Sequence, residues 1–231
     1  MIIGINGYSG SGKDAMGKII QELQPEKNWQ IKKFAGKLKT IASILTGIPE
    51  EKFESEEFKK RNLKKCWWTT CDEGYQPMTI REFLQKLGTD GLRNGLHEEV
   101  WVNALMADYK KTTDLKTFMY AKGYNDDRTF KKGETVSLNS LMEYMSETTF
   151  PNWIITDVRF YNEAQSIKEE GGVLVRINRF GIKPVNDHKS ETSLDGWAFD
   201  YIINNDFSLK DLKKDAEEIL SDICNPNKLR I

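Results

Sequence analysis

A chain of 231 residues with 39% apolar and 30% charged residues can bury a sizeable core, and we expect one α/β domain with an inserted or lid region. The 34 basic and 35 acidic residues give a net charge of −1, so the overall charge favours neither nucleic acid nor a membrane surface as a partner. No stretch approaches the ~20 apolar residues of a membrane span, and the N-terminal apolar run lacks the basic flank of a signal peptide. We therefore expect a cytoplasmic protein.

The chain has three cysteines, Cys66, Cys71 and Cys224, and an odd number without a secretory signal predicts free thiols in a reducing compartment. Cys66 and Cys71 have the look of half a metal site. No second pair of cysteines or histidines follows them, and the only histidines are His97 and His188. We therefore do not expect structural zinc.

The clearest motif lies at the start of the chain. Residues 2–5 have the length and branching of a short buried strand, residues 7–13 match G-x-x-x-x-G-K, and a helical pattern follows. Glycines let the loop backbone direct its N–H groups at phosphate oxygens, while the helix N-terminus and Lys13 add positive charge. A glycine-rich turn without a ligand is the alternative, but strand, loop, lysine and helix stand in the order that phosphate binding requires. Asp14 occupies the position where Ser or Thr usually offers a hydroxyl to Mg²⁺.

The next elements follow in an alternating pattern. Helical spacing predicts a helix over 14–23, a short strand over 29–35, and a second helix over 36–45 that ends before Gly47 and Pro49. Strand, phosphate loop, helix, strand and helix in this order are typical of a parallel α/β sheet.

The stretch 50–65 is a run of charges, which we interpret as a solvated helix face. The alternative is that Arg61 or a neighbouring lysine binds an anionic substrate from a helical flap. Trp67 and Trp68 follow directly, and we expect them to pack against another helix.

A helix is predicted over 78–92, with Thr79 as its N-cap and an apolar stripe that leaves Arg81 on one edge. Gly88-Thr89-Asp90 interrupts its regularity, and a further helical stretch covers about 98–109. We expect residues 110–152 to be an insertion, built as a hairpin and a short helix over 140–146.

The second half contains three more strands, predicted over 153–157, 173–177 and 201–203. The first ends in Asp157 and is followed at once by Arg159. Helices are expected over 162–170 and 209–223, the last capped by Ser208 or Asp206, and the polar stretch 180–197 is typical of a lid.

This pattern places a phosphate site at the carboxyl edge of the sheet. Phosphoryl transfer depends on in-line positioning and on cations around the transferred group. Lys13, Arg81, Arg159 and the lid residue Arg179 are the candidate cations, although each arginine could instead form a structural ion pair.

Several motifs together suggest a family. They are Ser11-Gly12-Lys13-Asp14, Phe34-Ala35-Gly36 with Leu38-Lys39, Arg81 with Leu87-Gly88-Thr89-Asp90, Trp101-Val102, Asp157-Val158-Arg159 with Glu163, His188 with Glu191, and the stretch 200–206. In these the chain resembles the deoxynucleoside monophosphate kinases of tailed bacteriophages, which are P-loop kinases. The resemblance implies a single α/β domain over residues 1–231, a three-layer sandwich around a mostly parallel five-stranded sheet. It also implies a helical substrate-binding region at about 48–109, the insertion at 110–152 and a lid at about 180–198.

The resemblance further implies roles for individual residues. Lys13, Asp157 and Arg159 are the expected catalytic residues, and the acceptor nucleotide is expected to contact Arg61, Arg81, Gly88, Thr89, Trp101, Arg159 and Glu163. ATP is expected to contact Gly10, Ser11, Gly12, Lys13, Asp14 and Asn205, and the lid to contribute Arg179 and His188. Asp14 and Asp157 are the expected Mg²⁺ residues, directly or through water. The family commonly has Asp after the lysine but then Thr, where this chain has Ala15.

The implied activity is transfer of the ATP γ-phosphate to a deoxynucleoside monophosphate for DNA precursor synthesis, in the host cytoplasm if the gene is phage-encoded. One alternative is a P-loop kinase for another small acceptor such as dephospho-coenzyme A. The other is a nucleotide-sensing module without efficient transfer. Aromatic residues in 110–152 are consistent with a homodimer surface or with a small core of the insertion.

Overall fold

The computed structural model describes residues 1–72, 74–110, 150–183 and 192–224, and its centre is a parallel sheet. The strands are β1 (Ile2–Asn6), β2 (Gln30–Lys32), β5 (Trp153–Ile155), β6 (Val173–Asn178) and β7 (Tyr201–Asn204), in the spatial order β2-β5-β1-β6-β7. Every neighbouring pair is parallel, with Ile2 opposite Trp153 and Ile3 opposite Val173. The predicted α/β class and five-stranded central sheet are confirmed.

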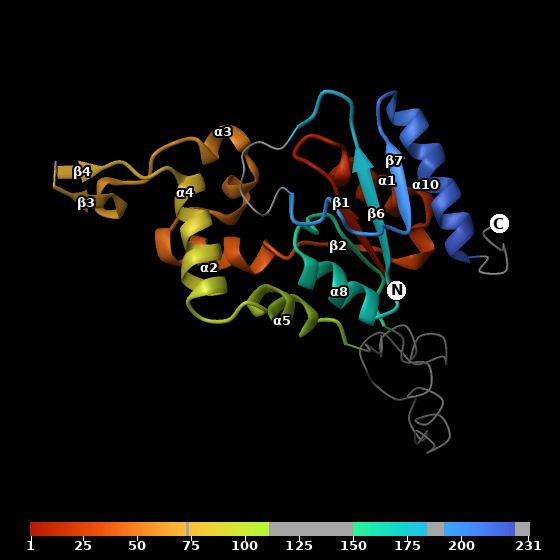
Figure 1. Cartoon of the computed structure of the whole chain (residues 1–231), viewed down its shortest axis with the longest axis horizontal. Helices are drawn as coiled ribbons and strands as arrows, with labels where there is room; N and C mark the ends of the chain where they lie inside the picture. The colour runs from red at the N-terminus through yellow and green to blue at the C-terminus, as the bar shows by residue number, and fades with distance from the viewer. Residues whose placement is uncertain (73, 111–149, 184–191, 225–231) are drawn as a thin grey trace, which may run out of the picture.

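Helices cover both faces of the sheet, which makes three layers (Figure 1). On one face α1 (Lys13–Leu23) packs beside α10 (Leu209–Cys224), and α8 (Tyr161–Glu169) covers the other. Successive side chains of a strand point to opposite faces, so Ile2 and Ile3 enter different cores. The core under α1 and α10 is formed by Ile3, Ile5, Met16, Ile20, Ile154, Val175, Ile177, Ile203, Leu212, Ala216 and Ile219. The core under α8 is formed by Ile2, Trp101, Leu105, Trp153, Ile155, Ala164, Ile167 and Leu174.

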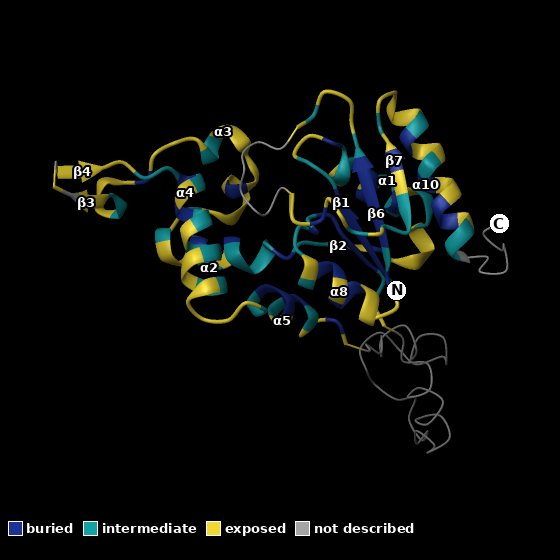
Figure 2. Ribbon diagram, in the orientation of Figure 1, coloured by how far each residue is buried: buried dark blue, intermediate teal, exposed yellow. Residues whose placement is uncertain are grey.

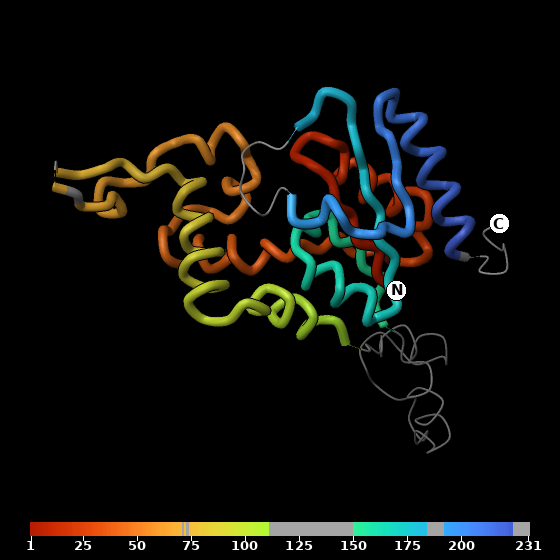
Figure 3. Tube along the Cα trace, viewed as in Figure 1, coloured from red at the N-terminus to blue at the C-terminus, as the bar shows by residue number. Residues whose placement is uncertain are grey.

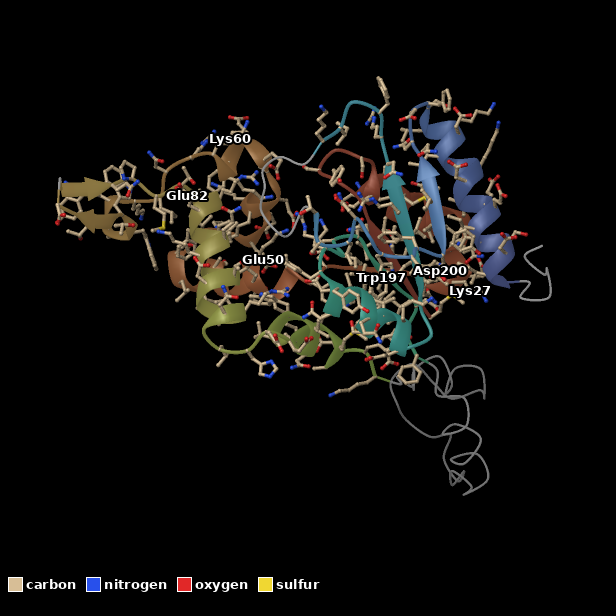
Figure 4. The ribbon with its side chains drawn as sticks, in the orientation of Figure 1. Lys27, Glu50, Lys60, Glu82, Trp197 and Asp200 are labelled. Atoms are coloured by element: carbon tan, nitrogen blue, oxygen red, sulfur yellow. The ribbon has the colours of Figure 1, made fainter. Side chains whose placement is uncertain are left out.

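A helical region extends from one side of the sheet, where the chain passes after β2 (Figure 3). It contains α2 (Gly36–Thr46), α3 (Glu56–Lys59), α4 (Ile80–Gln85) and α5 (Val100–Met106). It has a small core of its own, formed by Ala42, Phe53, Leu63, Ile80 and Phe83. Thr79 caps α4 as predicted, because its hydroxyl oxygen accepts the backbone N–H of Glu82. The Glu82 carboxylate, labelled in Figure 4, accepts the backbone N–H of Thr79 in turn.

Three local predictions differ from the structure. The charged stretch 50–65 is not one helix but a 3₁₀ turn at Glu50–Glu54, the single turn of α3 and irregular chain, because too few apolar residues repeat to anchor a longer helix. The hairpin of β3 (Thr69–Cys71) and β4 (Gly74–Gln76) was not predicted, and it projects from the helical region with exposed residues (Figure 2). Gly88-Thr89-Asp90 does not interrupt the helix after α4, which continues over Lys86–Asn94 as a π-helix.

Other predictions concern single residues. Trp67 packs edge-to-face on Phe83 of α4, with ring centroids 5.0 Å apart, as expected. The Trp68 indole N–H donates to the Leu63 carbonyl. Cys66 is a free, exposed thiol. Among the described residues no helix is long and apolar enough to cross a membrane.

Candidate active site at the carboxyl edge of the sheet

The phosphate loop joins β1 to α1, and its backbone conformation explains its glycines. Gly10 and Gly12 have φ of 83° and 107°, values that side chains with a Cβ rarely adopt. A Cβ at Gly12 would also lie 2.4 Å from Nδ2 of Asn205. Both positions therefore require glycine for the loop to close against the end of β7.

Predicted ATP-site residues surround this loop and donate to its carbonyl oxygens. Lys13 Nζ lies 2.7 Å from the Tyr8 oxygen, and Asn205 Nδ2 lies 2.8 Å from the Ser11 oxygen. Arg179 Nη1, after β6, lies 3.3 Å from the Gly10 oxygen. Three segments far apart in sequence thus place cationic or amide groups on one loop. His188 lies outside the described residues.

A cavity of about 250 Å³ opens beside the loop, between the sheet edge and the helical region. It brings together the predicted residues Arg81, Gly88, Thr89, Trp101, Asp157, Arg159 and Glu163. The remaining lining residues are Ser9, Phe34, Ala35, Leu38, Lys39, Glu56, Lys59, Leu84, Gln85, Arg93 and Phe160. Five lining residues are basic and three are acidic, so an excess of positive charge faces the cavity.

Arg61 does not line this cavity. Its guanidinium lies 3.2 Å from Glu57 on the exposed surface of the helical region and over the ring of Phe58. Arg81, in contrast, lines the cavity and is held by an ion pair with Glu56 from α3. The structure therefore separates the two arginines that the sequence had grouped at the acceptor phosphate.

Trp101 forms a buried wall of the cavity. Its indole N–H donates to the Gly88 carbonyl at 2.9 Å, and this hydrogen bond joins α5 to the π-helix. Gly88 is packed so closely on Leu38 that a Cβ there would lie 2.8 Å from Leu38 Cδ2. The predicted Trp101 and Gly88-Thr89 positions thus form one packed surface.

Glu163 lies on the opposite wall, and its carboxylate accepts bonds from protein groups. It accepts the backbone N–H groups of Arg159 and Phe160 at 2.8 and 3.1 Å, and Nη2 of Arg93 at 2.9 Å. Burial, reinforced by the nearby Asp157 carboxyl, raises the pKa of Glu163 to about 7. Glu163 therefore fixes the backbone at Arg159, a different use from the expected contact with base or sugar.

Arg93 was missed in the sequence. It lies near the end of the π-helix, stacked over the Phe160 ring at 3.9 Å and paired with the buried Glu163. The spacing in the sequence could have revealed it. Arg93 continues the four-residue spacing of Arg81, Gln85 and Thr89, and therefore lies on the same face once the predicted helix is extended beyond residue 92. Lys39, named only as part of the Leu38-Lys39 motif, and Lys59, one of the lysines near Arg61, also line the cavity.

Asp157 has both carboxylate oxygens turned to the backbone of the neighbouring segment. They accept the N–H groups of Phe34 and Ala35 at 2.8 and 2.9 Å, just before α2 begins. Burial raises the pKa of Asp157, against the opposing effect of these two bonds and of Arg159 and Lys33. The carboxylate thereby anchors the start of the helical region to the sheet edge.

Asp14 is arranged differently. Its Oδ1 accepts the Thr156 hydroxyl at 2.9 Å and lies 3.2 Å from Lys33 Nζ. Burial alone would raise the pKa of Asp14, but Lys33 and the Thr156 bond bring it below its ordinary value. Two-thirds of the side-chain surface is exposed, so this ionised carboxylate remains accessible.

The two carboxylates differ in how well they suit Mg²⁺, which in nucleotide sites is held by one or two carboxylates, phosphate oxygens and water. Asp14 fits this pattern, being ionised and exposed. Asp157 fits it less well, because burial raises its pKa and each of its oxygens already accepts one backbone N–H group. Within the described ranges no three His, Cys, Asp or Glu side chains cluster as a metal site.

Comparison with known proteins agrees with this geometry. Residues 134–216 match the family model described as deoxynucleotide monophosphate kinase. The chain is 27% identical over 231 residues to a putative deoxynucleotide monophosphate kinase of Acanthamoeba polyphaga mimivirus, covering 99% of each chain. It is also 24% identical over 142 residues to the deoxynucleotide monophosphate kinase of Escherichia phage RB69, covering 62% of this chain and 45% of that protein. The comparisons thereby confirm the resemblance inferred from the motifs: the chain is similar to proteins named deoxynucleotide monophosphate kinase.

Proposed function

We propose that this protein is a phosphotransferase that moves the γ-phosphate of ATP to a deoxynucleoside monophosphate, giving ADP and the diphosphate. The observation that carries the proposal is the cavity with its excess of basic residues, which reaches Ser9 of the phosphate loop. Donor and acceptor phosphates would then meet at one sheet edge, surrounded by cations, as phosphoryl transfer requires. The names of the relatives support a deoxynucleotide as acceptor.

In this proposal the loop N–H groups and Lys13 bind the donor phosphates, and Lys13 leaves the Tyr8 carbonyl to bridge the transferred group. Arg159, whose backbone Glu163 fixes, and Arg81 bind the acceptor phosphate. Trp101, Phe34 and Leu84 provide apolar surface against which a nucleoside can lie. Arg179, already on the loop, would add a cation on the donor side.

We assign Asp14 as the residue that would hold Mg²⁺, together with ATP oxygens and water. When bound, the ion would neutralise charge on the phosphates. Asp157 acts instead as the anchor of the Phe34–Ala35 backbone, which shapes the acceptor cavity. The proposed organisation is a single kinase domain, acting in the cytoplasm, in which the predicted substrate-binding region at about 48–109, the larger part of the helical region, binds the acceptor. Residues 111–149, with the predicted hairpin, helix and dimer surface, and residues 184–191 of the predicted lid lie outside the described residues.

The test is a coupled assay of ADP formation with purified protein, ATP, Mg²⁺ and each of the four common deoxynucleoside monophosphates. We expect at least one to accelerate ADP formation strongly, and its diphosphate to appear in equal amount. Lys13→Ala should lose this activity, whereas Lys18→Ala, an exposed lysine of the same helix, should retain it. ADP formation that no nucleotide acceptor accelerates would refute the proposal.

A further inference from the structure

Arg176 is a buried cation at the carboxyl end of β6 that the proposed reaction does not use. The residue is 8% exposed. Its Nη1 donates to the side-chain oxygen of Asn6, and its Nε donates to Asn178 at 3.2 Å. Its Nη2 lies 2.9 Å from Asp195, in the described C-terminal part of the predicted lid. A guanidinium so enclosed is costly to bury unless all its partners are held in place.

Tyr8 of the phosphate loop closes this cluster. Its ring lies 4.8 Å from the Arg176 guanidinium carbon, and its hydroxyl lies 3.1 Å from each carboxylate oxygen of Asp195. Tyr8, Arg176 and Asp195 therefore contact one another pairwise, although they come from the loop after β1, from β6 and from the segment before β7. We refer to these three residues as the edge triad.

The backbone of Tyr8 connects the edge triad to the phosphate loop. Its carbonyl accepts the Lys13 ammonium at 2.7 Å and the Ser11 N–H at 3.1 Å. The side chain of Tyr8 is thus fixed by the triad, while its carbonyl sets the resting position of Lys13. A shift of the Tyr8 ring would displace both the loop and the cation.

A second branch leads to the acceptor side. Asn6, held by Arg176, donates from its amide to the Val158 carbonyl at 2.7 Å, one residue before Arg159. The segment that carries Asp195 also reaches this place, because the Ser193 hydroxyl donates to the Arg159 carbonyl. One buried arginine therefore connects the phosphate loop, the Arg159 segment and the 192–195 segment.

We infer that Arg176 and Asp195 are positioning residues, which hold the phosphate loop through Tyr8 in the shape that binds ATP. This rests on the proposed function in so far as ATP is the ligand of the loop. Neither residue needs to touch the nucleotide. Their effect passes through the Tyr8 ring and carbonyl to Lys13 and the loop N–H groups.

The decisive variants are Tyr8→Phe, Asp195→Asn and the double variant. Tyr8→Phe removes the hydroxyl that donates to Asp195, and Asp195→Asn removes the charge that pairs with Arg176 and weakens the same hydrogen bond, each with little change in volume. The readout is the affinity for a non-hydrolysable ATP analogue, measured by calorimetry, with KM for ATP and kcat measured separately. We expect each single variant to weaken binding by about 3- to 10-fold, and the double variant to be no weaker than the poorer single, as for residues in one network. KM for the acceptor should change less than KM for ATP.

The matched control is Asp200→Asn. Asp200 is also ion-paired, with Lys168 at 2.9 Å, but it lies at the opposite, amino end of β7 (Figure 4). It should leave nucleotide affinity unchanged even where it lowers thermal stability. Arg176→Lys, which keeps the charge but cannot donate to Asn6 and Asp195 as a fork, should recover only part of the affinity lost in Arg176→Met.

The outcomes distinguish the proposed function from the positioning role of the edge triad. If the wild-type protein does not bind the analogue, both the proposed function and the edge triad's role are refuted. If it binds but the two single effects add, or if Asp200→Asn weakens binding equally, only the positioning role is refuted. Because Tyr8→Phe removes a single hydroxyl from a half-buried ring, its fold should persist even where Arg176→Met unfolds.

Discussion

Glu163→Gln should change how the stability of the protein depends on pH. The Glu163 side chain is 4% exposed, and burial beside Asp157 raises its pKa from 4.5 to about 7. Between these values the folded state binds a proton that the unfolded state does not, so the free energy of unfolding falls as pH rises. At about 1.4 kcal/mol for each pH unit, this group removes about 3 kcal/mol of stability between its protonated form near pH 4.5 and its ionised form above pH 7.

The assay is urea unfolding of the wild type and the variant at pH 5.0, 6.0, 7.0 and 8.0. Glutamine cannot ionise, so the variant should lose most of the decline across this range, although the raised pKa of Asp157 leaves some slope. Loss of the ion pair with Arg93 will lower its stability at pH 8, but the slope is the quantity compared. Glu169→Gln, an exposed position of the same helix, should keep the wild-type slope. Equal slopes in the wild type and Glu163→Gln would refute the reasoning.

Other substitutions test the site directly. Lys13→Ala should lower kcat on the order of 10²-fold or more, the typical effect of removing a transition-state charge contact, in a steady-state assay. Trp101→Phe removes the indole N–H that donates to the Gly88 carbonyl, so we expect about 1 kcal/mol lower stability in urea and a higher KM for the acceptor. Arg81→Met should raise the acceptor KM at least tenfold, whereas Arg61→Met, on the outer surface, should leave it unchanged.

The sheet was predictable because its signals are local. Apolar runs such as residues 2–5 and 173–177 can only be buried strands between helices, and the glycine positions of the loop fix the first crossing to α1. The phosphate-binding residues follow from the same motif, since Gly12 and Lys13 act through the backbone next to them. Asn205, far along the chain, was reached only through the family resemblance.

The acceptor side was harder, because its residues are selected by tertiary contacts. Arg61 and Arg81 look alike in sequence, yet Glu57 holds the first on the surface and Glu56 holds the second at the cavity. Arg93 was missed because the predicted helix ended at residue 92 and lost its regularity at Gly88-Thr89-Asp90, whereas the π-helix continues to Asn94. No periodicity in one segment reveals which cations will face another segment.

Asp157 shows the limit of carrying a role over by position alone. An aspartate at the carboxyl end of a strand beside a phosphate loop favours a metal ligand. Here the turn after β2 brings two backbone N–H groups, those of Phe34 and Ala35, directly to its oxygens. Position places the carboxylate at the site, and the backbone of another segment adds a structural role to it.

Asp14 places a negative charge in the first turn of α1, directly beside the expected phosphates, and Lys33 compensates for it. Lys33 Nζ lies 3.2 Å from Asp14 and 3.5 Å from Glu54, and these two carboxylates raise the pKa of Lys33 although its burial opposes them. Without the lysine, the carboxylate would repel the nucleotide. Two unit charges about 4 Å apart in water interact by about 1 kcal/mol, so Lys33→Met should weaken Mg²⁺-free ATP binding about fivefold.

The double variant Lys33→Met/Asp14→Asn gives the sharper result. If Lys33 acts by neutralising Asp14, removing both charges should restore Mg²⁺-free binding close to the wild-type value in calorimetry. If Lys33 instead contacts the phosphates itself, the double variant will bind as weakly as Lys33→Met, and the compensation account is wrong. Binding measured with Mg²⁺ tests the second role of Asp14, that of holding the ion. Asp14→Asn alone should lower the affinity for ATP when Mg²⁺ is present but not when it is absent. A loop that lacks the usual hydroxyl would thus keep an acidic residue whose charge is balanced, since Lys33, directly after β2, supplies the matching cation.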